Sequence, residues 1–253
     1  MNNQTDLIEY LLRLGDSALI QGQRLCQWCG KAPALEEELA LMNVGLDLVG
    51  QARNWLEYAA ELLNDGRSAD DLAFRRDERA YRNLLLVEQP NGDYAVTILK
   101  QFLYDAWHLP VLKGLSQSSD ERIAGIAAKA VKEVTYHLRR SGEWVERLGD
   151  GTEESHKRML AAIPEVWRFT VELTSADDSE QRLCDADMTP DIAQVAAAWQ
   201  ARVSQIFASA TLPVPDAANY FYLNARKGLH TEHLGILLAE MQCLPRAYPD
   251  ATW

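Results

Sequence analysis

Apolar residues recur every three or four positions along most of the chain, so that each segment has one apolar side when it forms an α-helix. Alternating or β-branched runs long enough for strands are missing. The pattern therefore predicts an all-α protein whose helices are separated by clusters of turn-forming residues. Long helices are expected near 5–28, 34–64, 93–115 and 120–148, shorter ones near 152–174, 190–209 and 229–243, and a linking turn or helix near 76–88.

The four long predicted helices are joined by short connections, which is typical of a four-helix bundle. The additional C-terminal helices would pack around the ends or sides of this bundle. A chain of 253 residues is long enough for one large helical domain with a buried core, and nothing in it requires a second one. We therefore expect a single domain over 1–253.

The side of each long helix that faces the bundle interior is apolar except near its middle. In steps of three and four residues, the polar members of these four stripes are Gln21, Gln51, Asp105 and His137, with Ser141 one turn beyond His137. Four helices would thus direct polar groups to one level of the bundle. Carboxylate-bridged di-iron proteins build their metal centres in this geometry.

The side chains at this level do not match what two iron ions require. Such a centre needs about four carboxylates to balance its charge, together with imidazole. Only Asp105 and His137 are good ligands here. One turn before Gln51 and His137, where a Glu-x-x-His pair would place its glutamate, stand Leu48 and Val134. We therefore expect no metal in this chain.

Three interpretations of the polar level remain open. In the first, the polar groups satisfy one another, with Asp105 and His137 forming an ion pair and Gln21 and Gln51 bridging the rest. In the second, the level holds a single or weakly bound metal ion. In the third, the assumed helix phase is wrong. Glu133 is expected to point away from the stripe, because a step of one residue rotates a side chain around the helix.

The charge of the chain narrows the classes of partner. A formal net charge of -12 opposes nonspecific binding to nucleic acid or to anionic membranes. The N-terminal stretch carries Asp6, Glu9 and Asp16 and lacks the basic start of a signal peptide, and no apolar run approaches the length of a membrane span. We expect a cytoplasmic protein. The acidic segment 177–180 is interpreted as solvated surface.

Two further groups of polar residues are candidates for contacts. The densest basic cluster comprises Arg75, Arg76, Arg79 and Arg82. These arginines could receive the phosphate of a ligand or an acidic partner surface, although a solvated or salt-bridged face is the usual role of such a cluster. His230 and His233 could share one helix face toward a metal, but the absence of a third ligand in the sequence favours hydrogen-bonding or interface roles.

Four strings of residues are distinctive. The most specific are Leu-Leu-Leu-Val-Glu-Gln-Pro-Asn-Gly at 84–92 and Gly-Leu-His-Thr-Glu-His-Leu-Gly at 228–235, and the other two are Leu46–Asn54 and Arg76–Arg79. In these strings, and over nearly its whole length, the chain resembles the C-subunit family of phenylacetyl-CoA epoxidase.

The resemblance implies a ferritin-like bundle that acts as a non-catalytic structural subunit, with no catalytic residues and no cofactor of its own. In that family a related A subunit holds a di-iron centre and epoxidises the aromatic ring of phenylacetyl-CoA with oxygen. A small B subunit and a reductase that carries flavin and iron–sulfur cofactors complete the complex. These three proteins are the partners that the resemblance implies.

The resemblance also implies which positions are remnants of a metal site. Where the A-subunit pattern reads Asp-Glu-Ala-Gly-His, this chain has Asp47-Leu-Val-Gly-Gln51, and where it reads Lys-Glu-Glu-Ser-Phe-His, this chain has Lys132-Glu-Val-Thr-Tyr-His137. The implied vestigial di-iron positions are Gln21, Leu48, Gln51, Asp105, Val134 and His137. Only Asp105 and His137 keep the identity of a ligand.

Two alternative functions predict different behaviour on purification. A catalytic subunit that binds iron through a degenerate ligand set should retain iron after mild purification. An independent helical binding module should not co-purify with an A subunit. Kinase and hydrolase chemistry have no support, because the chain lacks a phosphate-binding loop, a dinucleotide fingerprint and a nucleophile elbow.

Overall fold

The computed structural model of the chain describes residues 3–216, 224–249 and 251, and its regular structure in these ranges is helical, without any β-strand. The four long helices are α1 (Asn3–Cys26), α2 (Leu35–Leu63), α5 (Tyr94–Leu115) and α6 (Glu121–Gly149). Each begins and ends within about two residues of the range that the apolar spacing predicts, which is the usual uncertainty of a helix boundary. The all-α prediction is confirmed.

The shorter elements agree less closely with the sequence pattern. The expected short helices are α7 (Glu153–Trp167), α9 (Ile192–Ser209) and α10 (Glu232–Ala247), and single 3₁₀ turns are η1 (Glu78–Ala80), η2 (Thr170–Leu173) and η3 (Ala225–Lys227). The helix expected over 152–174 thus ends at Trp167 and continues as η2, while the linking segment contains η1 and α4 (Leu85–Glu88). Two helices were not predicted: α3 (Ala69–Phe74) and α8 (Asp178–Asp185).

Side chains at the boundaries explain where several long helices begin and end. Asp93 accepts a hydrogen bond from the Val96 N–H at 3.1 Å and so caps the start of α5. Asp120 caps α6 in the same way. α2 ends at Asn64, whose φ of 49° is left-handed, a conformation that asparagine tolerates better than most residues.

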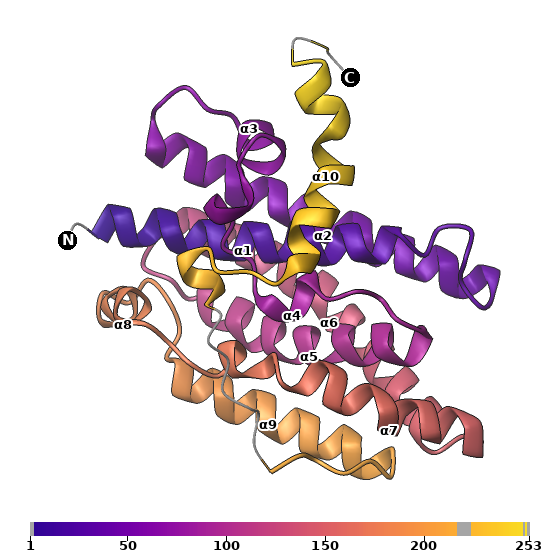
Figure 1. The fold of residues 1–253 in the computed structure, drawn as a ribbon. Coiled ribbons are helices and arrows are strands. Elements are labelled where there is room, and N and C mark those ends of the chain that lie inside the picture. The colour runs from indigo at the N-terminus through magenta and orange to yellow at the C-terminus, as the bar shows by residue number, and fades with distance from the viewer. Residues whose placement is uncertain (1–2, 217–223, 250, 252–253) are drawn as a thin grey trace.

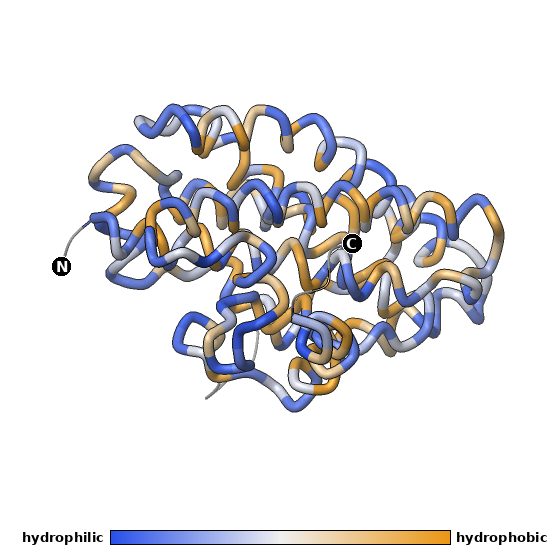
Figure 2. The backbone as a smooth tube through the Cα atoms, turned by 90° about the horizontal axis from the view of Figure 1, so that it is seen from above, coloured by the Kyte–Doolittle hydropathy of each residue, from blue (hydrophilic) through white to orange (hydrophobic). Residues whose placement is uncertain are grey.

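The long helices pack in the order α1, α2, α6, α5 around one apolar core (Figure 1). α7 and α9 pack on α5 and α6, α8 packs on α1, and α10 contacts α3 and α4 while running across the direction of α2. Apolar and polar residues alternate along the long helices in Figure 2, as expected when one side of each faces the interior. The predicted four-helix bundle with additional C-terminal helices is therefore confirmed.

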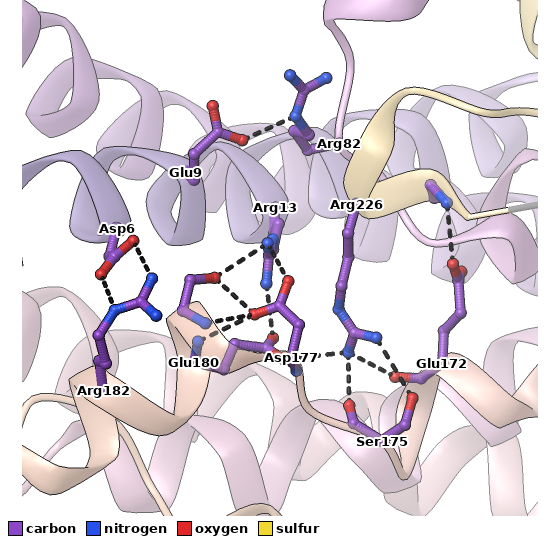
Figure 3. Close-up of polar contacts among 12 residues, drawn as sticks. Asp6, Glu9, Arg13, Arg82, Glu172, Ser175, Asp177, Glu180, Arg182 and Arg226 are labelled. Carbon is purple, nitrogen blue, oxygen red and sulfur yellow. Dashed lines mark hydrogen bonds and ion pairs between the residues drawn. The ribbon is translucent and has the colours of Figure 1, made fainter. Parts of the chain in front are cut away.

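The helix α8 is tied to α1 by ion pairs (Figure 3). Asp177 caps α8 and accepts a hydrogen bond from Arg13 of α1 at 2.6 Å, while Glu180 lies 3.3 Å from the same guanidinium. Arg182 donates two hydrogen bonds to Asp6, at 2.7 and 2.8 Å. The interpretation of the acidic segment 177–180 as solvated surface is wrong for Asp177 and Glu180, because their carboxylates hold α8 against the bundle, whereas Asp178 is exposed.

The helix α5 is buried on all sides over much of its length, because α4, α6, α7 and α9 pack around it. Every residue from Ala95 to Ala106 is buried, including polar ones. This position places α5 at the centre of the molecule, where its polar side chains contact those of α2 and α6. None of the helices in the described ranges combines the length and the apolar character that crossing a lipid bilayer requires.

Candidate functional site

The four polar residues predicted for the bundle interior all lie there. Gln21, Gln51, Asp105 and His137 are fully or almost fully buried, on α1, α2, α5 and α6 respectively. They belong to stripes that are otherwise apolar, since residues three and four positions apart share the buried side of a helix. The helix phase is therefore confirmed, and the alternative of a wrong phase is excluded.

The expected ion pair between Asp105 and His137 is not formed. The Ser141 hydroxyl donates to Asp105 Oδ2 at 2.8 Å, and His137 Nε2 lies 2.9 Å from Asp47 Oδ2. His137 and Ser141 are one turn apart on the same side of α6, between two neighbouring helices: His137 contacts α2 and Ser141 contacts α5. Asp47 lies at the border of the buried side of α2, with its side chain partly exposed, and is thus the partner of His137 that the analysis of the apolar stripes missed.

The two glutamines do not bridge the remaining groups either. Gln51 Nε2 donates to Glu133 Oε2 at 2.8 Å, so Glu133 is directed toward α2 rather than away from the polar level. Within the described part of the chain, neither amide atom of Gln21 has a hydrogen-bond partner, nor does Gln51 Oε1. Since most buried polar groups are paired, these unpaired atoms are a departure from ordinary core packing.

The interior contains more polar residues than the sequence indicated. Gln101, Tyr104 and His108 of α5 are buried, and polar atoms of all three lack a hydrogen-bond partner among the described residues. His108 lies next to Tyr104, with ring centroids 4.9 Å apart. No sequence signal marks Gln101 and Tyr104, because α5 is buried on all sides around them and its polar residues there do not define an outer face.

Burial controls the ionisation of the polar level. It raises the pKa of Asp105 to about 8, against the hydrogen bond from Ser141 that favours the carboxylate. It lowers the pKa of His108 to about 3, and it lowers the pKa of His137 against the hydrogen bond to Asp47. The Asp105 carboxyl and the two imidazoles are therefore mainly uncharged at pH 7.

The residues at this level do not fit a di-iron centre. Leu48 and Val134 are fully buried and put hydrocarbon at two of the implied ligand positions, while Gln21 and Gln51 put neutral amides at two others. In the ranges that the structure describes, no three His, Cys, Asp or Glu side chains are grouped so that they could hold a metal ion. Hard cations such as iron need several anionic oxygen ligands. The donor set thus does not support an iron centre in this chain.

His230 belongs to a buried hydrogen-bond cluster around Glu88. Its Nδ1 lies 2.8 Å from Glu88 Oε2, and its Nε2 lies 3.0 Å from the Tyr81 carbonyl oxygen. The backbone N–H and the hydroxyl of Thr231 donate to the other Glu88 oxygen at 2.6 and 2.7 Å. The hydrogen-bonding role expected for His230 is confirmed. His233 is partly exposed, and its interface role stays a prediction.

The four arginines of the basic cluster differ in their surroundings. Arg76 is only 7% exposed and its guanidinium is bound to Asp16, so it is not available to a CoA phosphate or a partner. Arg75 and Arg82 form ion pairs with acids at 3.1 and 2.8 Å. Arg79 is exposed. A contact role is therefore wrong for Arg76 and stays a prediction for Arg75, Arg79 and Arg82.

Two comparisons with known proteins give matches over nearly the whole chain. The family model described as "Phenylacetic acid catabolic protein" matches residues 1–253. The chain is also 52% identical over 247 residues to a protein of Escherichia coli (strain K12) that is named as the C subunit of 1,2-phenylacetyl-CoA epoxidase, covering 98% of this chain and 99% of the relative. Because the family model spans the chain from end to end and the relative shares half of its residues, this chain belongs to the phenylacetic acid catabolic protein family.

Proposed function

We propose that this chain is the non-catalytic structural subunit of a 1,2-phenylacetyl-CoA epoxidase, the oxygenase of aerobic phenylacetate degradation. The observation that carries the proposal is the donor set in the bundle interior. Leu48 and Val134 replace carboxylates with buried hydrocarbon, and Asp105 and His137 are bound to other residues of this chain. The Escherichia coli relative is named as one subunit of such an epoxidase, which supports the assignment to a multi-subunit complex.

The proposed partners are a catalytic A subunit that holds the di-iron centre, a small B subunit and a transiently bound reductase with flavin and iron–sulfur cofactors. In this proposal the present chain holds no cofactor and resides in the cytoplasm with its partners. Its contribution is a preformed helical surface that orders the catalytic subunit. Because such a surface is already ordered before binding, this chain loses little conformational freedom when the complex forms.

Reconstitution of the complex tests the proposal. The chain alone, supplied with reductase, reductant and oxygen, should not convert phenylacetyl-CoA, whereas its complex with the A subunit should. In that complex, Asp105→Asn and His137→Ala in this chain should leave turnover unchanged, because neither side chain would ligate the reacting metal. Substitutions of the carboxylate ligands in the A subunit serve as the matched control and should abolish turnover.

Two outcomes would contradict the proposal. Turnover by the isolated chain, or loss of turnover when His137→Ala still forms the complex, would indicate a catalytic iron-binding subunit. Failure of the wild-type chain to co-purify with an A subunit at low salt would instead indicate an independent binding module.

A further inference from the structure

One helix of the bundle carries a row of exposed apolar side chains. Of the ten large apolar residues that are exposed in the described part of the chain, four lie on α2 at intervals of four, seven and three: Leu35, Leu39, Leu46 and Val49. This spacing places all four on one side of the helix. Contiguous exposed apolar patches of this kind usually mark a protein–protein interface.

A hollow of about 180 Å³ lies beside this row, between α2 and α6. Leu46 belongs to the row and also lines the hollow on the α2 side, while Lys129 and Glu133 line it on the α6 side. The row and the hollow are therefore parts of one continuous surface, which we call the α2–α6 face and define by Leu35, Leu39, Leu46, Val49 and the hollow.

An exposed glycine that lines the hollow leaves open space where a side chain would stand. Gly50 lies in the middle of α2 and lines the hollow, and a Cβ atom added to it would meet nothing within 4 Å. Two glycines nearby differ, since a Cβ at Gly45 would lie 3.0 Å from Cys26 Sγ and one at Gly22 would lie 3.1 Å from a backbone oxygen. Glycine weakens a helix interior, so its place here suits the close approach of another chain.

The polar lining of the hollow favours a donor-bearing cation. Gln51 is 2% exposed and lines the hollow, and its Oε1 accepts no hydrogen bond within the ranges described. The carboxylates of Asp47 and Glu133 lie beside it, against one ammonium from Lys129. Carboxylates thus outnumber cationic groups in this lining, and an arginine or lysine side chain from outside would complement both the charge and the unpaired oxygen.

We propose that the α2–α6 face binds the catalytic subunit of the epoxidase through a helix that lays apolar residues along the row and inserts an arginine or lysine side chain into the hollow. The inference rests on the proposed function for the identity of the partner. Helix-in-groove contacts of this type take their affinity from apolar anchors and their register from one or two charged groups.

Binding of purified variants to the immobilised catalytic subunit tests the inference. Leu46→Asp and Gly50→Leu should each raise Kd about tenfold or more, because the first puts a charge on the row and the second fills the hollow. Asp47→Asn combined with Glu133→Gln should weaken binding and make it less dependent on salt. Ile236→Asp is the matched control: Ile236 is 63% exposed on α10, against 67% for Leu46, and its substitution should leave Kd within about twofold of the wild type.

Gly50→Ala separates binding from folding. Alanine is the better helix former, so this variant should raise the melting temperature of the isolated chain while weakening the complex. If the wild-type chain binds, but the α2 variants bind equally well or only Ile236→Asp loses binding, the inference is overturned and the proposed function stands. If the wild-type chain itself does not bind, the proposed function fails as well.

Discussion

Replacing Arg76 by alanine should lower the free energy of unfolding of this chain by about 3–5 kcal/mol, the usual cost of removing one partner from a buried ion pair. Asp16 on α1 is completely buried, and Arg76 binds it with two guanidinium nitrogens, one of them at 3.1 Å. The same guanidinium donates to the Leu72 and Ala80 carbonyl oxygens, so it joins α1 to the segment after α3. The substitution would leave the Asp16 charge buried and largely uncompensated.

Urea denaturation followed by circular dichroism measures this effect, and the neighbouring arginine provides the control. Arg75 is 48% exposed and pairs with Asp71 at the surface, so Arg75→Ala should cost less than about 1 kcal/mol. Replacing Asp16 and Arg76 together by apolar residues should cost less than Arg76→Ala alone, because no charge is then left unpaired. Equal losses for Arg75→Ala and Arg76→Ala would show that the buried pair does not stabilise the fold.

Replacing Asp105 by asparagine should stabilise the chain by an amount that grows with pH. Burial raises the pKa of Asp105 to about 8 from an ordinary value of 3.8, so the folded state binds a proton that the unfolded state has released. The stabilising contribution of this group is complete below the unfolded pKa and is lost as pH rises toward 8. Asparagine does not titrate, so the difference in unfolding free energy between variant and wild type should grow by about 1.4 kcal/mol per pH unit between pH 5 and 7.

Denaturation curves at pH 5, 6 and 7 check this prediction. Ser141→Ala is the matched control, since it removes the hydroxyl that donates to Asp105 but keeps the carboxyl group. Its pH dependence should follow that of the wild-type chain. A constant difference between Asp105→Asn and the wild type over this range would mean that the carboxyl ionises in the interior as it does in water.

The long helices could be predicted from the sequence because their apolar spacing persists over many turns and because residues such as Asp93 and Asp120 mark their starts. The helix α8 could not, since Leu183 is its only buried residue and its stabilising contacts are distant in sequence. Arg13 and Asp177, which hold it to α1, are separated by 164 residues. Without that partner, an acidic segment has the composition of a solvated loop.

The position of the candidate site in the bundle could likewise be predicted, but the hydrogen-bond partners of its residues could not. Spacing alone places Asp105 and His137 on the interior sides of their helices. Which neighbour each side chain contacts depends on its rotamer and on the offset between the helices. The partner of His137 is Asp47, which lies 90 residues away in the sequence and at the border of the buried side of α2. Gln101 escaped prediction because the helix around it, from Ala95 to Ala106, has no exposed side for comparison.

The proposed function depends on the lack of an iron-binding donor set among the described residues of this chain. Measuring the iron content per chain, with and without the catalytic subunit, tests it most directly. The chain purified alone and its complex with the catalytic subunit would both be analysed for metal content, with and without His137→Ala in this chain. We predict far less than one iron per isolated chain, and iron in the complex that His137→Ala does not change. A pair of irons bound to the isolated chain and lost on His137→Ala would contradict this.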